Sequence, residues 1–231
     1  MRLRLAFPLL FLALAACGRP TPQADAPTTG ATPSPATTPA APSTPPPQAS
    51  ASDDAWKAPL TAVFEQPSGT IRIRLEVTEA PQLCANFVNL AQRGFFANQT
   101  WDDFSPVVRQ TQAIGPGFDI GYQLPKDFSP KLLFDQGGLL CVSNVTDDPG
   151  SRTRPNRIFI TVKPQDRWNL VYSVIGRIVE GQSVAQNLVQ GERIRSVRIE
   201  GDAGPLLARY AKDVAAWNAA IDARLPKAAR P

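Results

Sequence analysis

Any chemistry in this chain must come from side chains other than histidine. The 231 residues contain no histidine, which excludes Ser-His-Asp and Cys-His nucleophiles and metal sites built on histidine ligands. The chain also lacks a Gly-x-x-x-x-Gly-Lys-Ser/Thr phosphate loop. Gly115, Gly117 and Gly121 lie close together, but Pro116 interrupts them and no helical pattern follows. A dinucleotide loop is therefore not predicted, and we expect neither a cofactor nor a metal ion.

The charge balance argues against a nucleic-acid partner. The formal net charge is +4, from 24 basic and 20 acidic residues. Two of the basic residues, Arg2 and Arg4, lie in a segment that we expect to be removed, which would lower the charge to about +2. Nucleic-acid binding usually requires a dense basic stripe, which this balance does not supply.

Three short apolar runs between Gly138 and Gly181 have the composition of buried strands. They are rich in β-branched and aromatic residues and are bounded by Gly, Pro, Asn or Asp. This pattern is typical of strands in a barrel or sandwich. The runs are Gly-Leu-Leu-Cys-Val-Ser-Asn (138–144), Arg-Ile-Phe-Ile-Thr-Val (157–162) and Tyr-Ser-Val-Ile-Gly-Arg-Ile-Val-Glu-Gly (172–181).

The segment before these runs predicts a hairpin followed by a helix. Apolar and polar residues alternate over 71–77, and Pro67-Ser68-Gly69 is a turn signal that joins this strand to 62–64. A helix is predicted to begin near Pro81 and to end at Gly94, with one apolar face formed by Leu83, Phe87, Leu90 and Ala91. Further on, we expect a short helix over 181–190 and a final strand over 194–199.

These elements resemble the cyclophilins, a family of peptidyl-prolyl isomerases. Residues 80–96 are similar to the family pattern A-P-x-x-x-x-N-F-x-x-L-x-x-x-G-F-Y, and the three apolar runs follow in the family's order. The resemblance covers roughly residues 60–200. It implies a mainly β fold over 56–201, namely a closed eight-stranded antiparallel barrel with a helix over each open end. The interior of such a barrel is packed with side chains, so the substrate groove is expected on its outer surface.

The resemblance also implies a non-covalent reaction. An X–Pro bond isomerises over a barrier of ~18–20 kcal/mol and takes tens of seconds or longer without a catalyst. The catalyst holds the proline ring in an apolar pocket and twists the amide. A positioned arginine in the family donates a hydrogen bond to the prolyl nitrogen of the twisted state.

The position of the family's arginine holds a different residue here. In the family pattern G-F-Y-D-G-x-x-F-H-R-V, aligned on Gly94 without a gap, Asp102 replaces the histidine and Asp103 replaces the arginine. An ionised carboxylate accepts hydrogen bonds and cannot donate one. The glutamine of the next strand corresponds to Thr111 without a gap, or to Gln112 with one inserted residue.

Other groove positions are matched or replaced by residues of a similar kind. Phe159 matches the phenylalanine of the proline pocket, Val108 is a smaller substitute for a second one, and Arg157 replaces a glutamine. The resemblance implies a substrate groove that contains Val108, Ser143, Asn144, Phe159, Trp168 and Tyr172.

Two arginines are candidates for the missing donor. We hypothesise that Arg109 or Arg157 projects into the groove from another strand. The alternative is that both are solvated surface residues near a basic loop that contains Arg152 and Arg154. The candidate catalytic residues are therefore Arg109, Arg157, Gln112 and Asp103.

The N-terminal region predicts a lipoprotein leader and a tether. Arg2 and Arg4 precede a short apolar run, and Leu14-Ala15-Ala16-Cys17 is similar to the bacterial lipobox, in which the cysteine is acylated and becomes the new N-terminus. The alternative is an ordinary secretory signal over 1–17. Because residue 19 is not Asp, we expect an outer-membrane lipoprotein that faces the periplasm. Residues 18–55 are rich in Pro, Ala and Thr, so they cannot form a core and predict a disordered tether.

The C-terminal region lies outside the resemblance. Over 202–231, apolar residues recur at steps of three and four, which predicts one amphipathic helix. It could pack on its own barrel or pair with another protein. The apolar residues are Leu207, Tyr210, Val214, Trp217, Ile221 and Leu225.

Two cysteines remain after Cys17. Cys84 falls on the predicted helix and Cys141 on a predicted strand that such a helix could cover. The periplasm permits disulfides, so a Cys84–Cys141 bond and two buried free thiols both stay open.

Three functional interpretations follow. The first is a lipid-anchored periplasmic peptidyl-prolyl isomerase that assists the folding of envelope proteins, with a modified groove and weakened activity. The second is an inactive cyclophilin-like module that binds Pro-containing peptides or a partner protein. The third is a platform for the C-terminal helix. The expected partners are Pro-containing or unfolded envelope proteins and the bilayer, through acylated Cys17, but no nucleic acid.

Overall fold

The computed structural model describes residues 53–112, 119–146, 148 and 150–224. These residues belong to one compact unit, Ala49–Pro231. The predicted leader (1–17), the acylation site Cys17 and the predicted tether up to residue 52 lie outside the described residues. Residues 225–231 of the predicted C-terminal helix also lie outside them.

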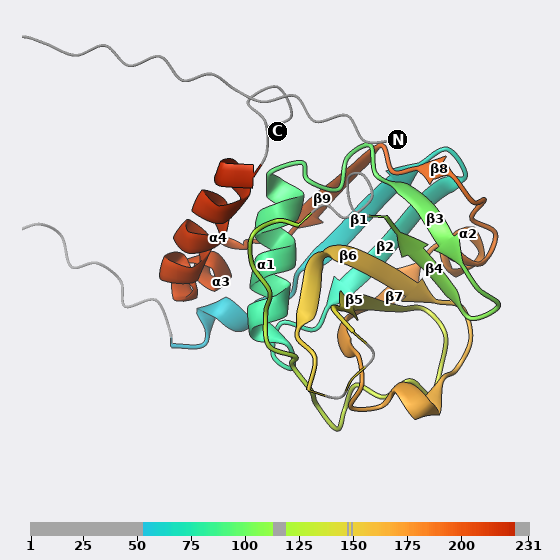
Figure 1. Cartoon of the computed structure of the whole chain (residues 1–231), viewed down its shortest axis with the longest axis horizontal. Coiled ribbons are helices and arrows are strands. Elements are labelled where there is room, and N and C mark those ends of the chain that lie inside the picture. Colours follow the sequence, from blue (N-terminus) through green and yellow to red (C-terminus); the bar gives the residue numbers. More distant parts are fainter. Residues whose placement is uncertain (1–52, 113–118, 147, 149, 225–231) are drawn as a thin grey trace, which may run out of the picture. The chain divides into compact units, whose positions relative to one another are not determined.

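The described residues contain an antiparallel sheet of nine strands (Figure 1). Its spatial order is β8-β3-β4-β6-β5-β7-β2-β1-β9. The strands are β1 (Thr61–Gln66), β2 (Gly69–Leu75), β3 (Thr100–Phe104), β4 (Val108–Thr111), β5 (Leu139–Asn144), β6 (Thr153–Thr161), β7 (Ser173–Glu180), β8 (Glu192–Arg193) and β9 (Ser196–Glu200).

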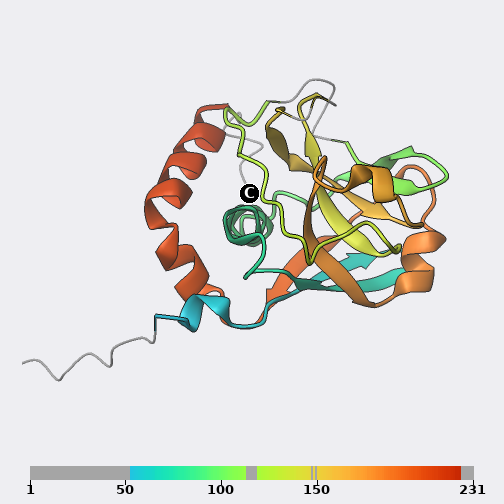
Figure 2. The same ribbon diagram turned by 90° about the horizontal axis from the view of Figure 1, so that it is seen from below.

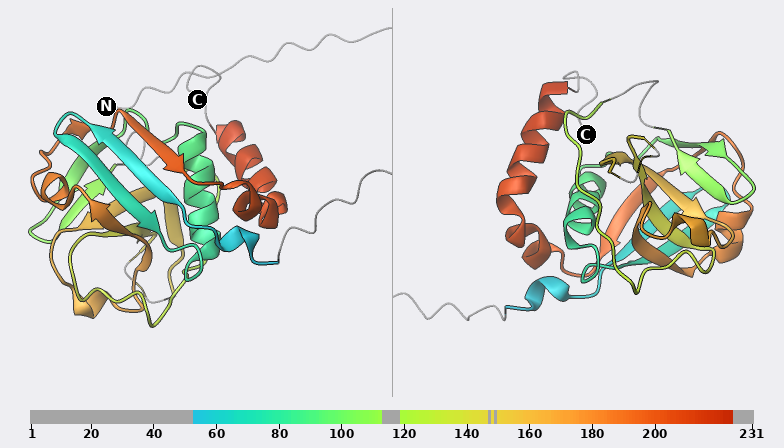
Figure 3. Two further views of the ribbon diagram at one scale, coloured as in Figure 1. Left: turned by 180° about the vertical axis from the view of Figure 1, so that it is seen from behind. Right: turned by 60° about the horizontal axis from the view of Figure 1, so that its bottom comes forward.

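The prediction of a closed eight-stranded barrel was wrong. The sheet curls around its core, but β8 and β9 form its two edges, and no strand pairing joins them among the described residues. Strand β8 has only two residues, and both pair with β3, so it offers no second ladder to β9. Strand β9 lies along β1 and leads to the C-terminal helices (Figure 3).

The predicted hairpin and first helix are confirmed. Strands β1 and β2 pair up to the turn, where Gln66 stands opposite Gly69. Gly69 has a φ of +134°, which a residue with a side chain rarely adopts. Helix α1 (Pro81–Gln92) begins with its proline in the first turn, where a missing N–H costs no helical hydrogen bond. Gly94, with a φ of +69°, follows the helix end.

Helix α1 packs against the sheet and contributes its buried side chains to the main core. Its inner face packs on the sheet near β6 and β9, and Phe87 stacks on Phe64 of β1 and on Phe96 at centroid distances of 6.2 and 5.2 Å. The indole Nε1 of Trp101 on β3 donates to Gln66 Oε1 at 2.9 Å, which satisfies the only polar atom of that fully buried ring.

The C-terminal segment forms two helices in the described residues, where one was predicted. Helix α3 (Gly204–Arg209) and helix α4 (Ala211–Arg224) are separated at Tyr210. Neither Gly nor Pro marks this break, so the sequence pattern gave no signal of it. Trp217 and Ile221 of α4 are buried in the same core as α1.

Helix α4 lies beside α1 (Figure 2), and polar side-chain contacts also join the two. Arg93, just after α1, donates to Asn218 Oδ1 at 2.7 Å and to Asp222 Oδ1 at 2.5 Å. The C-terminal helices therefore pack on the domain that precedes them.

Three short helical turns complete the described fold. The 3-10 turn η1 (Ala55–Lys57) lies beside α3, where the Arg209 guanidinium stacks 4.4 Å from the Trp56 ring (Figure 2). The others are η2 (Asp166–Trp168) and α2 (Gln182–Gln186), which is shorter than the helix predicted over 181–190. None of the helices in the described ranges is both long and apolar enough to span a membrane.

Candidate active site

A pocket of about 180 Å³ opens on the surface formed by β3, β4 and β6. It is bordered on one side by the segment from η2 to the start of β7. Its lining residues are Asp103, Ser105, Val108, Gln110, Phe159, Trp168 and Tyr172. Four of the six predicted groove residues line it, together with the candidate Asp103.

One wall of the pocket is aromatic. The rings of Phe159, Trp168 and Tyr172 contact one another edge to face, with centroid distances of 5.3–5.9 Å. A buried apolar cluster supports these rings and separates them from the main core; its buried members are Val108, Leu132, Phe134, Leu139, Cys141, Phe159 and Val174. This wall can accommodate a small apolar ring.

The opposite wall is polar, and its lining residues Asp103 and Gln110 both contact Arg157. Nη2 of Arg157 on β6 donates to Asp103 Oδ2 on β3 at 2.7 Å. The amide oxygen of Gln110 on β4, oriented toward these donors, lies 2.5–3.2 Å from all three guanidinium nitrogens. Arg157 Nε also donates to the Thr111 carbonyl oxygen at 3.3 Å.

The strand order explains why these three side chains meet. Strand β4 lies between β3 and β6, and Gln110 stands opposite both Asp103 and Phe159. Arg157 precedes Phe159 by two residues, so alternation along a strand places both on the same face.

The other candidate arginine lies elsewhere. Arg109 follows Val108 and precedes Gln110, so its side chain leaves the opposite face of β4. Its Nη1 donates to the carbonyl oxygens of Ser105 and Val108 at 2.8 and 3.0 Å. Its Nη2 donates to the Gln186 carbonyl oxygen at 3.2 Å, at the end of α2. Neither arginine is among the residues that line the pocket. Arg157 binds the side chains of two that do, Asp103 and Gln110, whereas Arg109 binds only backbone carbonyl oxygens.

Gln112 does not line the pocket, whereas Gln110 does. Gln112 is exposed beyond the end of β4, and its backbone N–H donates to the Thr100 carbonyl oxygen at 3.3 Å. The sequence analysis missed Gln110. The signal that identifies it is its spacing of two residues from Val108, which places both on one face of the strand.

Ser143 and Asn144 are buried at the end of β5 and do not line the pocket. Asn144 Nδ2 donates to the Val171 carbonyl oxygen at 3.0 Å. Because Val171 lies between Trp168 and Tyr172, this hydrogen bond supports the segment that carries both rings.

The chain is similar to known proteins over most of the described fold. Residues 61–203, well over half of the chain, match the family model described as cyclophilin type peptidyl-prolyl cis-trans isomerase/CLD. The chain belongs to the cyclophilin family.

Individual relatives agree with this assignment. The chain is 30% identical over 151 residues to a peptidyl-prolyl cis-trans isomerase of Synechococcus elongatus, covering 62% of this chain and 97% of that protein. It is 30% identical over 138 residues to peptidyl-prolyl cis-trans isomerase B of Bacillus subtilis, covering 57% and 91%.

Solved structures show the same fold. A cyclophilin type isomerase of Cryptosporidium parvum has a TM-score of 0.55 at 17% identity, covering 62% of this chain and 99% of that one. A second structure of that protein, in the presence of the dipeptide Ala-Pro, has a TM-score of 0.53 at 18% identity and covers the same shares.

Within this cyclophilin fold, the two described cysteines are free and lie on opposite faces of the sheet. Cys84 of α1 belongs to the main core and donates to the Ile175 carbonyl oxygen at 3.4 Å. Cys141 belongs to the apolar cluster beneath the pocket, beside Val174. Burial raises the pKa of both thiols, so both are protonated near neutral pH.

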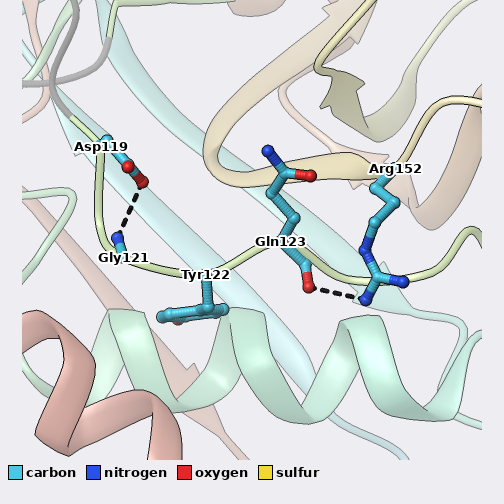
Figure 4. A pocket seen from close by; sticks show the side chains of 5 residues that line it. All are labelled: Asp119, Gly121, Tyr122, Gln123 and Arg152. Atoms are coloured by element: carbon cyan, nitrogen blue, oxygen red, sulfur yellow. Dashed lines mark hydrogen bonds between the residues drawn. The ribbon is translucent and has the colours of Figure 1, made fainter.

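A second hollow, of about 320 Å³, has a different character (Figure 4). It is lined by Asp119, Gly121, Tyr122, Gln123 and Arg152. Arg152 Nη2 donates to the Gln123 carbonyl oxygen at 2.9 Å, and the Tyr122 ring points toward α1 and stacks on Trp217. Burial raises the pKa of Tyr122 to about 12. This hollow lacks an aromatic wall like that of the first pocket and contains none of the predicted site residues.

No group of three or more Cys, Asp or Glu side chains in the described ranges is arranged to hold a metal ion. The candidate active site is the pocket with one aromatic wall and one polar wall, in which the Asp103 and Gln110 side chains bind Arg157.

Proposed function

We propose that the protein is a peptidyl-prolyl cis-trans isomerase in which Arg157 supplies the hydrogen-bond donor. Membership in the cyclophilin family implies the activity. The observation that carries the proposal is that one pocket combines three aromatic rings with a guanidinium bound to two of its lining residues.

Each wall of the pocket has a role in the proposed reaction. The proline ring enters against Phe159, Trp168 and Tyr172, where burial of its methylene groups favours binding. As the amide twists, its nitrogen loses resonance and becomes a hydrogen-bond acceptor. A guanidinium at the pocket edge can donate to that nitrogen and so stabilises the twisted state more than either planar state.

Arg157 has one N–H group left for this task. A guanidinium carries five N–H donors. In the described residues, Nε is contacted by the Thr111 and Gln110 oxygens and Nη2 by Asp103 Oδ2 and the Gln110 oxygen. Only the Gln110 oxygen contacts Nη1, so one of its two N–H groups remains for the prolyl nitrogen.

We further propose that the substrates are proline-containing segments of envelope proteins and that the protein is a lipid-anchored, periplasm-facing outer-membrane protein. The support is the lipobox at Leu14–Cys17 in the sequence. Replacing Cys17→Ser should abolish incorporation of labelled fatty acid; continued incorporation would refute the anchor.

The chemistry of the proposed substrate has one precedent among the similar structures. The Cryptosporidium parvum protein was crystallised in the presence of Ala-Pro, a proline dipeptide. The alternative function is an inactive module that binds such peptides, and it is favoured by Asp103, which occupies the position of the family's arginine.

A protease-free assay of X–Pro isomerisation decides between the two. We would use the chain from Gly18 onward over a range of concentrations, with Arg157→Ala as the test variant. Acceleration that rises with wild-type protein and falls about 100-fold in Arg157→Ala supports the proposal. A flat wild-type response with intact peptide binding supports the binding module.

A further inference from the structure

The carboxylate at position 103 has a role that its chemistry alone does not suggest. We propose that Asp103 and Gln110 are positioning residues, which fix the Arg157 guanidinium at the pocket so that the donor is supplied from β6 in place of β3. The inference rests on the proposed function and deepens it. Asp103 occupies the position of the family's arginine on β3. In this proposal it holds Arg157 on β6, which takes over the role of that arginine.

Asp103 can act on the substrate only through a partner residue. An ionised carboxylate has no hydrogen to give to a prolyl nitrogen. Its Oδ2 accepts from Arg157 Nη2 at 2.7 Å, which is the distance of a charge-assisted hydrogen bond. The acceptor lies on the far side of β4 from Arg157, so the long side chain must extend across β4 to reach it.

Gln110 of the middle strand β4 contacts the guanidinium group of this extended side chain. Its amide oxygen is within 2.5–3.2 Å of Nε, Nη1 and Nη2 of Arg157. Gln110 stands opposite Asp103 in the sheet register, so both acceptors lie in one row across the strands. Asp103 binds one terminal nitrogen and Gln110 contacts all three nitrogens, so together they fix the position of the planar group and also its orientation.

Thr111 of β4 holds the Nε end of the guanidinium group and also binds the β6 backbone beside Arg157. Thr111 contacts β6 twice: its hydroxyl donates to the Ile158 carbonyl oxygen at 3.1 Å and accepts from the Ile158 N–H at 3.2 Å. The Thr111 carbonyl oxygen accepts from Arg157 Nε. All three acceptors therefore hold the guanidinium group: Thr111 at Nε, Asp103 at Nη2, and Gln110 across its three nitrogens.

Folding stability does not explain these contacts. The Asp103 side chain is 55% exposed and that of Arg157 is 28% exposed. Exposed ion pairs contribute little to stability because water screens them and ordering long side chains costs entropy. A donor fixed before the substrate binds, in contrast, avoids that ordering cost in the transition state. The arrangement is therefore better suited to catalysis than to folding.

The test is a double-mutant cycle on the chain from Gly18 onward. Asp103→Ala and Gln110→Ala should each lower kcat roughly 10- to 100-fold with little change in KM, because the donor is displaced while the aromatic wall is intact. In an Arg157→Ala background, neither change should lower kcat further. Asp102→Ala and Gln112→Ala are matched controls at neighbouring positions outside the pocket, and they should leave kcat unchanged.

A reciprocal exchange provides a second test. Asp103→Arg combined with Arg157→Gln places the arginine on β3 and a glutamine on β6, as in the family pattern. This double variant should recover activity that Arg157→Gln alone has lost. Additive losses in the cycle, or a wild-type kcat for Asp103→Ala, would overturn the inference.

A readout without activity separates this inference from the proposed function. The NMR signal of the Arg157 Nε–H group should show a rigid side chain in the wild type and a mobile one in Asp103→Ala and Gln110→Ala. A rigid Arg157 in a chain without isomerase activity would overturn only the proposed function. A wild-type Arg157 that is as mobile as in the two variants would overturn the positioning roles and leave the proposed function standing.

Discussion

The Arg157 guanidinium on β6 and the Asp103 carboxylate on β3 meet at 2.7 Å, although β4 lies between their strands. Gln110 stands opposite both Asp103 and Phe159, and Arg157 shares the face of Phe159, so all these side chains lie on one face of the sheet. The long arginine side chain can therefore reach across the middle strand. The positive charge thus reaches the pocket from a different strand than the family pattern predicts. The pocket keeps a donor although position 103 has lost one.

The aromatic wall should determine substrate binding more than the rate of the chemical step. Trp168→Ala removes one of the three rings and should raise KM about tenfold with a smaller effect on kcat, because this contact is made in both the ground state and the transition state. Steady-state kinetics on an X–Pro peptide would measure this. Trp56→Ala is the matched control, since Trp56 packs on Arg209 away from the pocket. A fall in kcat at constant KM would contradict the prediction.

The two described thiols should be inert in the folded protein. Cys84 and Cys141 are buried on opposite faces of the sheet, and burial raises the pKa of both, so little reactive thiolate forms. In a Cys17→Ser chain, an alkylating reagent should label neither thiol before unfolding and both after it. The result should be the same with and without a reductant. Thiols that appear only after reduction would reveal a disulfide and contradict this arrangement.

Acid should remove one identifiable contribution to stability. Glu79 accepts hydrogen bonds from Lys131 Nζ at 2.8 Å and from Ser129 Oγ at 2.6 Å. Both contacts lower the pKa of Glu79, and the hydrogen bond from Lys131 has the larger effect. A lowered folded-state pKa means that the stabilisation is fully present above the unfolded value of about 4.3. It is lost as the pH falls through the folded-state value.

The measurement for Glu79 is urea unfolding of wild type and Glu79→Gln at pH values from about 7 down to about 2.5. The wild type should be more stable at neutral pH, and the difference should shrink as the pH falls below about 4. Glu180→Gln serves as a control: Glu180 pairs with Arg72 but is 72% exposed, and exposed ion pairs contribute little to stability. A Glu79→Gln difference that stays constant down to the lowest pH would contradict the assignment.

The C-terminal helices should stabilise the domain through one large side chain. Trp217 is only 5% exposed, packs in the core with α1 and stacks on Tyr122 with ring centroids 6.1 Å apart. Trp217→Ala should lower the free energy of unfolding by about 3–5 kcal/mol, as for other buried aromatic truncations. Chemical denaturation would measure this, with Ala216→Ser on the exposed face as a neutral control. A loss below about 1 kcal/mol would show that α4 is not integral to the core.

The sequence by itself determined the parts of this protein that depend on local signals. Pro67 to Gly69 specify a hairpin turn, and Pro81 and Gly94 delimit α1, because these residues restrict or permit backbone conformations that few others share. The motif over 80–96 identified the family, and Phe159 was correctly placed in an aromatic pocket. Each of these signals lies within a few neighbouring residues.

Only the tertiary structure decided which distant residues meet. Whether Arg109 or Arg157 approaches Asp103 depends on the face and register of β4 against β6, and the choice between Gln110 and Gln112 depends on where β4 ends. The open edge between β8 and β9 is also decided by strand pairing. Strand β8 has only two residues, which is too short for a sequence pattern to predict the strand or its unpaired edge. Register is fixed by packing across the whole sheet, so a one-residue shift that sequence motifs tolerate sends a side chain to the opposite face.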